Sequence, residues 1–324
     1  MKKAHLYYFS GTYNTKLIAD KVKNELNISG YETLLENIEN TRISTKHNEA
    51  DLIGIISPVY GFGLPVPVVR FLNTMPEGKK QKTFVFTSCG GHEGVAIVQC
   101  LRTLKSKKYD VIFARKLVMP DTWLLAVNAP TQEKFDKAKE KVEEDIKQSI
   151  NSIIDDKRKI NIANPLLLLL LGFIYSIFYL IGRHLAGKSF ITNHKCTSCK
   201  TCYSSCPSKT INWDKNNRPN WSWNCFQCFR CINTCPSDAI EISGYTTIAG
   251  LVSLFVADIP YRLIPISISN KLYPLNLPLR VFLFVVAAFI FVWCVDRLIK
   301  NHTLSRIIPK WYMTTNRKRY KNYN

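Results

Sequence analysis

Through the first 160 residues, short runs of hydrophobic residues alternate with segments in which hydrophobic residues recur at helical spacing. Short apolar runs with the character of buried strands cover residues 3–9, 31–36, 51–57, 82–88 and 111–118. Segments with helical spacing cover residues 14–26, 66–74, 93–106 and 131–155. Strands that alternate with helices are typical of a parallel sheet covered on both faces. We therefore predict an α/β, doubly wound parallel sheet for this part of the chain.

Three loops that leave the predicted strands carry small residues and turn formers: SGTYNT at 10–15, SPVYGFG at 57–63 and SCGGHEG at 88–94. In an open parallel sheet, ligands bind beyond the carboxyl ends of the strands. The first loop places hydroxyl and amide groups before a helix, whose N-terminus favours an anion. It lacks the Lys of a nucleoside-triphosphate loop, so a flavin mononucleotide (FMN) phosphate fits better than ATP. The alternative is that these are ordinary turns, with Ser10 or Thr12 capping the helix.

All three loops contribute to the expected flavin site. Tyr60 and Phe62 offer flat apolar walls, and the third loop can present backbone N–H groups to a ring system. Cys89 is expected near the flavin, and His92 is either a proton donor to reduced flavin or simply a polar loop residue. The expected set is Ser10, Thr12, Asn14, Thr15, Pro58, Tyr60, Gly61, Phe62, Ser88, Gly90 and Gly91.

The chain also contains one cysteine pattern twice. CTSCKTCYSSCP at 196–207 and CFQCFRCINTCP at 225–236 share the spacing C-x-x-C-x-x-C-x-x-x-C-P, displaced by 29 residues. Zinc sites usually show pairs of C-x-x-C separated by a longer loop, so zinc and disulfides are the weaker alternatives. The spacing matches two-cluster bacterial ferredoxins, in which the fourth cysteine of each run binds the other cluster.

This crossed scheme predicts the ligands of two 4Fe-4S clusters. The first cluster would use Cys196, Cys199, Cys202 and Cys235, and the second Cys206, Cys225, Cys228 and Cys231. KTINW and DAIEI, which follow the two runs, are expected to be short strands of one small pseudo-symmetric sheet. Cys100 and Cys294 are expected to be buried thiols.

The order of these parts resembles a known family, in which a flavodoxin-like domain is fused to a bacterial-type two-cluster (2x 4Fe-4S) ferredoxin, found mainly in anaerobic microbes. FSGTYNT, SPVYGFGLP, TSCGG and the two cysteine runs carry the resemblance, over roughly residues 1–243. The resemblance implies FMN in the three loops and electron transfer between flavin and clusters, but no particular substrate. Tyr13 stands where the family's phosphate loop usually has Gly, which bears on whether the backbone can approach a phosphate.

Charge and apolar segments point to a membrane. The net charge is +20, and residues after 160 hold 19 Lys and Arg against 5 Asp and Glu. Uncharged NPLLLLLLGFIYSIFYLIG at 164–182 has basic flanks, and we expect it to lie in the membrane interface or between the domains. Two crossings, near 247–269 and 277–297, would keep the redox domains and the basic tail inside. The alternative is that these segments are core helices of a soluble protein.

Five parts follow from these patterns. They are a flavodoxin-like FMN-binding domain at 1–160, a hydrophobic linker helix at 161–186, a two-cluster ferredoxin domain at 187–244, membrane helices at 245–300 and a basic tail at 301–324. The start of the chain lacks the long apolar core of a signal peptide, so we expect the redox domains to face the cytoplasm at the cell membrane.

The expected function is electron transfer between the clusters and FMN, with a redox partner protein or a small-molecule acceptor, and membrane lipid as a further partner. The alternative is a flavin-dependent oxidoreductase that reduces a quinone or another small molecule, with the ferredoxin domain as electron inlet. A third possibility is a cluster-bearing scaffold, if Tyr13 excludes flavin. A nucleic-acid role is not expected, because the basic residues adjoin apolar segments and cysteine runs without a known binding module.

Overall fold

The computed structural model describes residues 1–39, 47, 49–256, 276–300 and 311–320 of the 324-residue chain. Contacts within the chain define two compact units. The first comprises Met1–Phe178, Cys228–Arg230 and Lys318–Asn324, and the second comprises Tyr179–Gln227 and Cys231–Arg317.

A six-stranded parallel sheet forms the centre of the first unit. Its strands are β1 (Lys2–Tyr8), β2 (Tyr31–Asn37), β3 (Leu52–Pro58), β4 (Lys82–Cys89), β5 (Asp110–Val118) and β6 (Lys159–Ile160). They lie in the order β2-β1-β3-β4-β5-β6. The first five follow the flavodoxin-like order 2-1-3-4-5. The predicted fold class is therefore confirmed, and the short edge strand β6 is an addition that the sequence pattern did not predict.

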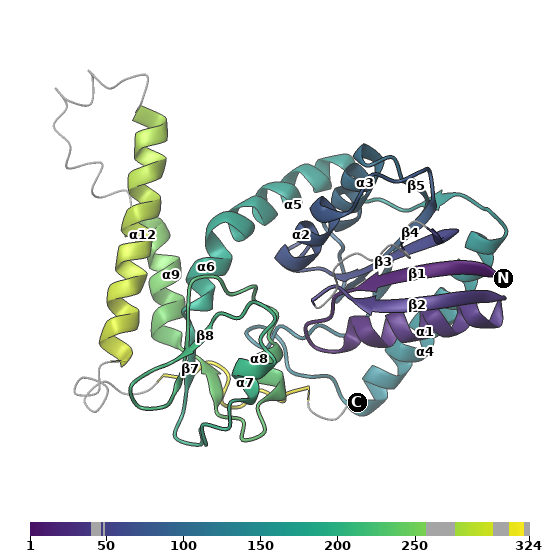
Figure 1. Ribbon diagram of the computed structural model, residues 1–324. Coiled ribbons are helices and arrows are strands. Elements are labelled where there is room, and N and C mark those ends of the chain that lie inside the picture. Colours follow the sequence, from purple (N-terminus) through teal and green to yellow (C-terminus); the bar gives the residue numbers. More distant parts are fainter. Residues whose placement is uncertain (40–46, 48, 257–275, 301–310, 321–324) are drawn as a thin grey trace. The chain divides into compact units, whose positions relative to one another are not determined.

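Four helices cover the two faces of this sheet (Figure 1). Apolar residues of α1 (Asn14–Ile28) and α4 (Gln132–Ile154) share one core cluster with the sheet, and those of α2 (Val66–Thr74) and α3 (Ala96–Ser106) share another. Every residue of β3 is buried, as expected for a central strand between two helical layers. The carboxyl ends of β1, β3 and β4 therefore lead the three predicted loops to one edge of a rigid sheet.

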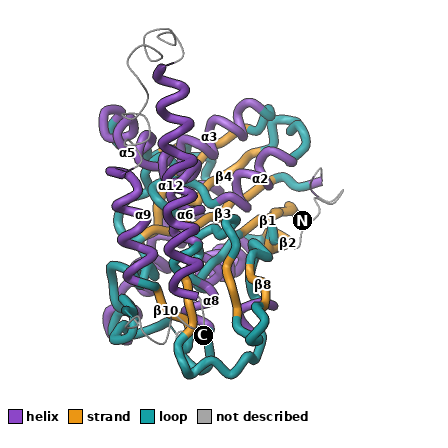
Figure 2. The backbone as a smooth tube through the Cα atoms, turned by 90° about the vertical axis from the view of Figure 1, so that its left-hand side faces the viewer, coloured by secondary structure: helices purple, strands orange, loops and turns teal. Residues whose placement is uncertain are grey.

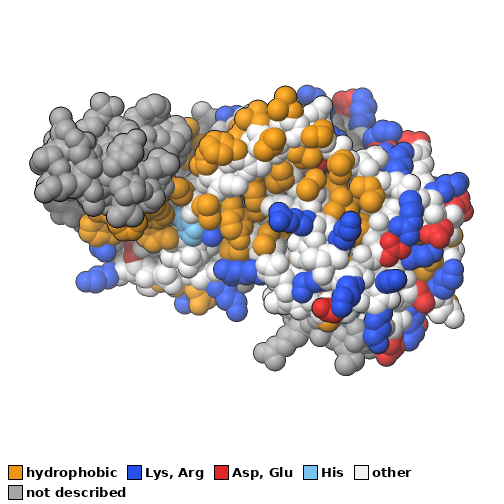
Figure 3. Space-filling view, turned by 90° about the horizontal axis from the view of Figure 1, so that it is seen from above, with side chains coloured by type: hydrophobic (Ala, Val, Ile, Leu, Met, Phe, Trp, Pro, Cys, Tyr) orange, Lys and Arg blue, Asp and Glu red, His pale blue; other side chains and the backbone are white. Residues whose placement is uncertain are grey.

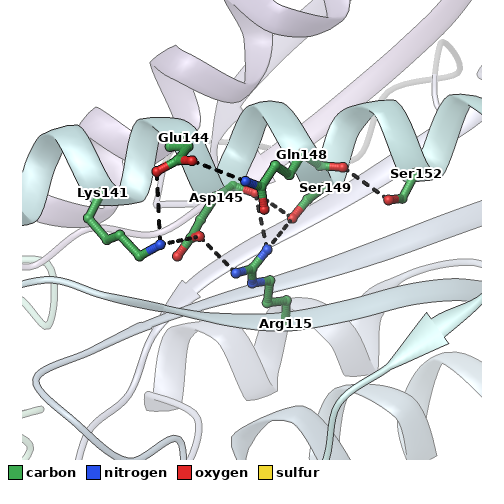
Figure 4. A network of polar contacts seen from close by, with 7 residues as sticks. All are labelled: Arg115, Lys141, Glu144, Asp145, Gln148, Ser149 and Ser152. Carbon is green, nitrogen blue, oxygen red and sulfur yellow. Dashed lines mark hydrogen bonds and ion pairs between the residues drawn. The ribbon is translucent and has the colours of Figure 1, made fainter.

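A polar network joins α4 to the sheet (Figure 4). Arg115 of β5 forms an ion pair with Asp145 at 2.8 Å and donates a hydrogen bond to the Ser149 hydroxyl at 3.3 Å. Lys141 approaches the same Asp145 carboxylate at 3.4 Å. Arg115 is partly buried, so its aliphatic stem packs while its guanidinium fixes the position of the helix along the strand.

A long apolar helix follows α4. It comprises α5 (Pro165–Ile177), the π-helical turn η2 (Phe178–Gly182) and α6 (Arg183–Gly187). Asn164 caps its start, because its side-chain oxygen accepts a hydrogen bond from the Leu166 N–H at 2.9 Å, and Pro165 occupies the first turn. Within the described residues, Pro165–Gly187 is the one helix long and apolar enough to cross a membrane, and 11% of its apolar 18-residue window is buried.

The second unit contains two small antiparallel sheets. β7 (Phe190–Thr192) pairs with β10 (Ile240–Ile242), and β8 (Ile211–Trp213) pairs with β9 (Pro219–Trp221). The strands expected in KTINW and DAIEI are present as β8 and β10, but the prediction that they share one sheet is wrong. Each finds another partner: β8 forms a hairpin with β9, and β10 pairs with the strand that precedes the first cysteine run. The short helices are α7 (Thr201–Ser204) and α8 (Arg230–Thr234).

Two further helices of the second unit, α9 (Gly244–Val256) and α12 (Asn276–Lys300), lie side by side (Figures 1 and 2). Asp296 of α12 is buried and pairs with Lys300 at 2.5 Å and with Lys188 at 3.7 Å. The expected crossing near 247–269 falls partly outside the described residues, which end at Val256 before resuming at Asn276. The two C-terminal crossings therefore stay a prediction.

Candidate functional site

The first loop keeps an unusual backbone conformation at Tyr13. This residue is the N-cap of α1, with φ 80° and ψ −31°. Glycine adopts such positive φ values freely, whereas a bulky side chain there costs about 1 kcal/mol or more. The loop therefore has a glycine-like conformation at Tyr13, and the Tyr ring lies beside the Lys16 ammonium, 5.5 Å from the ring centroid.

Two predicted phosphate ligands contact another loop. The Thr12 hydroxyl donates to the Thr122 hydroxyl at 2.9 Å, and the Asn14 amide donates to the Pro120 carbonyl at 2.9 Å. The loop after β5 thus supports the first loop, although sequence reasoning left it out. The capping alternative at Ser10 or Thr12 is not seen, since Tyr13 occupies the N-cap position.

The first loop fits an anionic group. The Ser10 hydroxyl is buried and has no hydrogen-bond partner among the residues that the structure describes. Thr15 is buried in the first turn of α1, which carries no acidic residue. At Gly11, a Cβ atom would come within 2.0 Å of the Tyr60 hydroxyl oxygen, so the backbone needs glycine here. An orphan hydroxyl beside a helix N-terminus suits a phosphate.

The second loop is a tight turn. Tyr60 and Gly63 exchange backbone hydrogen bonds at 2.9 and 3.1 Å, and both central residues have positive φ, 56° at Gly61 and 71° at Phe62. This is the pattern of a type I′ turn. Phe62 is 38% exposed, whereas Tyr60 is partly buried against Phe9, and burial raises the pKa of Tyr60 above its usual value. Of the two expected flat walls, Phe62 is therefore the exposed one.

The third loop is bound to the second. The Val95 N–H donates to the Phe62 carbonyl at 2.8 Å, and a Cβ at Gly94 would come within 2.0 Å of the same oxygen. His92 Nδ1 accepts a hydrogen bond from the Gly94 N–H at 2.9 Å, which fixes the imidazole ring within its own loop. A Cβ at Gly91 would meet no atom within 4 Å, so this position is open.

The other expected members of these loops also lie at this edge. Ser88 is the penultimate residue of β4, and its carbonyl accepts a hydrogen bond from the N–H of Val59, which follows Pro58, at 3.0 Å. Gly90 packs closely, because a Cβ there would come within 2.8 Å of the Asp121 Cβ. Cys89 is buried, and burial raises the pKa of its thiol to about 11, so it is protonated at neutral pH.

In the second unit, one cavity is lined by cysteines of both runs. Cys196, Cys199 and Cys202 of the first run meet Cys235 of the second around it, together with Trp213. The Cys199 sulfur lies 3.4 Å from the Thr201 hydroxyl, and hydrogen bonding from Thr201 lowers the pKa of that thiol. The Cys235 sulfur accepts a hydrogen bond from the Ala239 N–H at 3.3 Å. Such donors stabilise thiolates and the clusters that thiolates bind.

The other predicted set is divided between the units. Cys206, Cys225 and Cys231 belong to the second unit, and Cys228 belongs to the short segment grouped with the first. The Cys225 sulfur accepts a hydrogen bond from the Gln227 N–H at 3.4 Å, and the Cys206 sulfur lies 3.3 Å from the Ser208 hydroxyl. Among the described side chains, no group of three or more His, Cys, Asp or Glu forms a site for a single metal ion. The second ligand set stays a prediction.

The three remaining cysteines are all free thiols. Cys100 is fully buried in α3, as expected, and burial raises the pKa of its thiol to about 12. Cys294 is exposed on α12, so the prediction that it is buried is wrong. Its position on an apolar helix explains the error, because an apolar sequence neighbourhood does not require that the helix be covered by protein.

Sequence reasoning missed two groups of supporting residues. Pro120 and Thr122 follow β5 at the same end of the sheet as the other loops, which the parallel strand order could have indicated. Tyr175 lies on α5, and its hydroxyl donates to the Leu64 carbonyl at 2.9 Å, directly after the second loop. The only sequence signal for Tyr175 was a polar-tipped aromatic residue in an otherwise apolar segment.

Comparisons with known proteins find similarity in both halves of the chain. Residues 188–236 match a family described as a 4Fe-4S dicluster domain. No curated protein matches the chain. The solved structures similar to the chain include a flavodoxin of Streptococcus pneumonia TIGR4, with 16% identity, a TM-score of 0.35, and coverage of 47% of this chain and 99% of that chain.

Two more solved structures cover the same half of the chain. Two-electron reduced Megasphaera elsdenii flavodoxin has 24% identity and a TM-score of 0.34, covering 43% of this chain and 98% of that chain. Rubredoxin oxygen:oxidoreductase from Desulfovibrio gigas has 16% identity and a TM-score of 0.34, covering 48% of this chain and 37% of that chain. Because these TM-scores are low, the flavodoxin-like fold is assigned from the strand order of the sheet and not from similarity to these structures.

Fold and site together define the class of protein. The chain joins a flavodoxin-like domain to a ferredoxin-type domain with 4Fe-4S ligand runs. The second of these domains carries ligand runs for iron–sulfur clusters, which are groups that carry electrons.

Proposed function

We propose that the protein passes electrons between two 4Fe-4S clusters and FMN at the cytoplasmic surface of the cell membrane. The observation that carries this proposal is the cavity where Cys235 of the second run meets Cys196, Cys199 and Cys202 of the first. That exchange of the fourth ligand is the arrangement of two-cluster ferredoxins. The matching set would be Cys206, Cys225, Cys228 and Cys231.

FMN is supported by the loops of the first unit. Ser10, Thr15 and the start of α1 would hold the phosphate, and the Tyr60–Gly63 turn and the open Gly91 would flank the ring system. Bound clusters and FMN would supply the redox chemistry, while the protein binds and orients them. Electron transfer needs no general acid or base, so the fixed His92 ring requires no catalytic role.

Membrane attachment is supported by the outer side of α5. Leu166, Leu169 and Phe173 are 77%, 75% and 66% exposed, an apolar surface that water solvates poorly. Viewed from above, hydrophobic side chains gather over the part of the first unit where α5 lies (Figure 3). Three basic residues precede the helix at 157–159, and anionic headgroups attract such residues. We propose membrane lipid as the partner of this surface.

The proposal is tested by an anaerobic reductive titration of the detergent-purified full chain, followed by absorbance, with iron and flavin counted on the same sample. We expect about eight iron atoms and about one FMN per chain, with flavin and cluster bands that both bleach. Iron without flavin would overturn the FMN part. About four iron atoms would overturn the two-cluster part.

A second candidate is a flavin-dependent reduction of a quinone, with the ferredoxin domain as electron inlet. The observation that favours it is the contact of exposed, apolar α5 with the second flavin loop, because a lipophilic acceptor would concentrate along such a helix. No G-x-G-x-x-G fingerprint follows a strand, so direct use of NADH is not expected. Anaerobic mixing of the reduced protein with a short-chain quinone separates the candidates. The rate of reoxidation should saturate with quinone concentration if the protein has a quinone site, and should rise in simple proportion to it for a pure carrier.

A further inference from the structure

Helix α5 has one buried stripe on an otherwise exposed surface. Leu171 and Tyr175, which are four residues apart and share one face, are each 7% exposed. The neighbouring Leu170 and Ile174 are 57% and 40% exposed. A helix that served only as a lipid anchor would need no such stripe, so the buried face has its own packing partner.

The packing partner is the second flavin loop. The Tyr175 hydroxyl donates to the Leu64 carbonyl at 2.9 Å, and this bond is buried. A Cβ at Gly63 would come within 2.2 Å of the Tyr175 ring, and a Cβ at Gly61 within 2.3 Å of the Phe178 ring. Both glycines of the turn are therefore required partly because aromatic rings from the end of α5 and the start of η2 lie directly on the backbone.

The turn needs such support. Phe62 has a positive φ of 71°, which is strained for an aromatic residue, and strained positions persist only where their surroundings hold them. On one side, the Leu64 N–H donates to the Gln99 side chain of α3 at 2.8 Å. The opposite backbone group, the Leu64 carbonyl, is held by Tyr175. Helix α3 thus binds the backbone N–H of Leu64, and helix α5 binds its backbone carbonyl.

We propose that Tyr175 and Phe178 are positioning residues of the flavin site. Through them, the junction of the apolar helix α5 with η2 fixes the Tyr60–Leu64 turn in the conformation that receives the flavin ring. This inference rests on the proposed FMN site and extends it to a segment outside the flavodoxin-like sheet. The inner stripe of α5 then orders the turn, while its outer face remains free for lipid.

The test compares Tyr175→Phe with Ser176→Ala in the detergent-purified full chain. Tyr175→Phe keeps the ring and removes the hydroxyl, leaving a buried carbonyl without its donor. Ser176 is the matched control, because its hydroxyl donates within the helix, to the Gly172 carbonyl at 2.8 Å. The first readout is hydrogen exchange of the peptide that covers residues 58–64, and the second is the FMN dissociation constant from equilibrium dialysis.

We expect Tyr175→Phe to speed exchange of this peptide about tenfold and to weaken FMN binding by a similar factor, the equivalent of one lost buried hydrogen bond. Ser176→Ala should change neither. Phe178→Leu tests the second contact, with faster exchange expected around Gly61. Unchanged exchange and unchanged affinity in both aromatic variants would overturn the inference. If the wild-type chain bound no FMN, the proposed function would fail, and the exchange arm alone would still decide the role of α5.

Discussion

The three predicted flavin loops and the two cysteine runs differ in how close together their residues lie in the sequence. Three ligands of the first predicted cluster, Cys196, Cys199 and Cys202, lie within seven consecutive residues, and only Cys235 comes from a distant segment. The flavin loops follow three different strands and meet only because the sheet adopts the order β2-β1-β3-β4-β5. A cluster site of this kind is largely local, whereas the proposed flavin site would exist only in the folded first unit.

This difference predicts different sensitivities. A local site fails when one of its ligands is lost, while much of the surrounding chain stays folded. A site assembled from loops also depends on the residues that hold the loops in place, such as Thr122, Pro120 and Tyr175. A substitution of one cysteine ligand should therefore remove a whole cluster. A substitution of one loop support should lower the affinity for flavin only partly.

The largest effect is expected for Cys235→Ser. The cluster that Cys196, Cys199 and Cys202 share with Cys235 should be lost, because Ser replaces one of its four thiolates. Iron should fall from about eight to about four atoms per chain in an iron assay. The electron paramagnetic resonance spectrum of the reduced protein should lose the signal of this cluster and keep that of the other.

The reciprocal variant Cys206→Ser serves as control for the crossed scheme. It should remove the cluster of Cys225, Cys228 and Cys231 and leave the other signal in place. If Cys206→Ser and Cys235→Ser removed each other's expected cluster, each run would bind its own cluster and the crossed assignment would be wrong. FMN content should stay at the wild-type level in both variants.

An intermediate effect is expected from acid on the first unit. His47 is buried, with Nδ1 3.0 Å from the Tyr7 hydroxyl and Nε2 2.6 Å from the Tyr109 hydroxyl, while His5 bonds the same Tyr7. Burial, followed by the nearby His5, lowers the pKa of His47 from 6.5 to about 4. Between these values the unfolded state binds more protons, so stability falls as the pH drops from about 6.5 to 4. The loss is about 3 kcal/mol.

Urea unfolding followed by hydrogen exchange of the β1 peptide measures this loss. His47→Gln keeps an amide that can hydrogen-bond the two tyrosines but cannot titrate, so it should lack this part of the acid sensitivity. An equal acid response in wild type and His47→Gln would show that other groups control it. The iron count at each pH separates unfolding of the first unit from acid loss of the clusters.

Sequence reasoning predicted most of the helices and strands, but few of the residues that hold the loops in place. The strands β1 to β5 and the helices α1 to α4 appear within a few residues of their expected ends, because strand and helix periodicities are set by burial along the chain itself. The pairing of β8 with β9 and the exposure of Cys294 were missed, because both depend on which surface a segment meets. The partners of Thr12, Asn14 and Leu64 lie 35 or more residues away, and no periodicity marks them.

The smallest effect is expected for Tyr13→Gly. Relief of the positive φ at Tyr13 should stabilise the first unit by about 1 kcal/mol, partly offset by the greater freedom of Gly in the unfolded chain. FMN binding should be preserved or tightened, because the backbone already has the conformation that Gly favours. Urea unfolding and equilibrium dialysis measure the two quantities. A large loss of FMN affinity would show that the Tyr13 side chain itself contributes to the site.

Lys108→Gly is the matched control for this change. Lys108 has a similar positive φ of 66°, but it lies before β5, away from the three loops. The same relief of strain should therefore stabilise the unit without any change in FMN affinity. If the two variants gained stability equally and only Tyr13→Gly tightened FMN, the phosphate loop would be limited by the bulk of the Tyr side chain and not by its backbone. If both variants gained the same stability and neither changed FMN affinity, the Tyr13 side chain would not contact the phosphate.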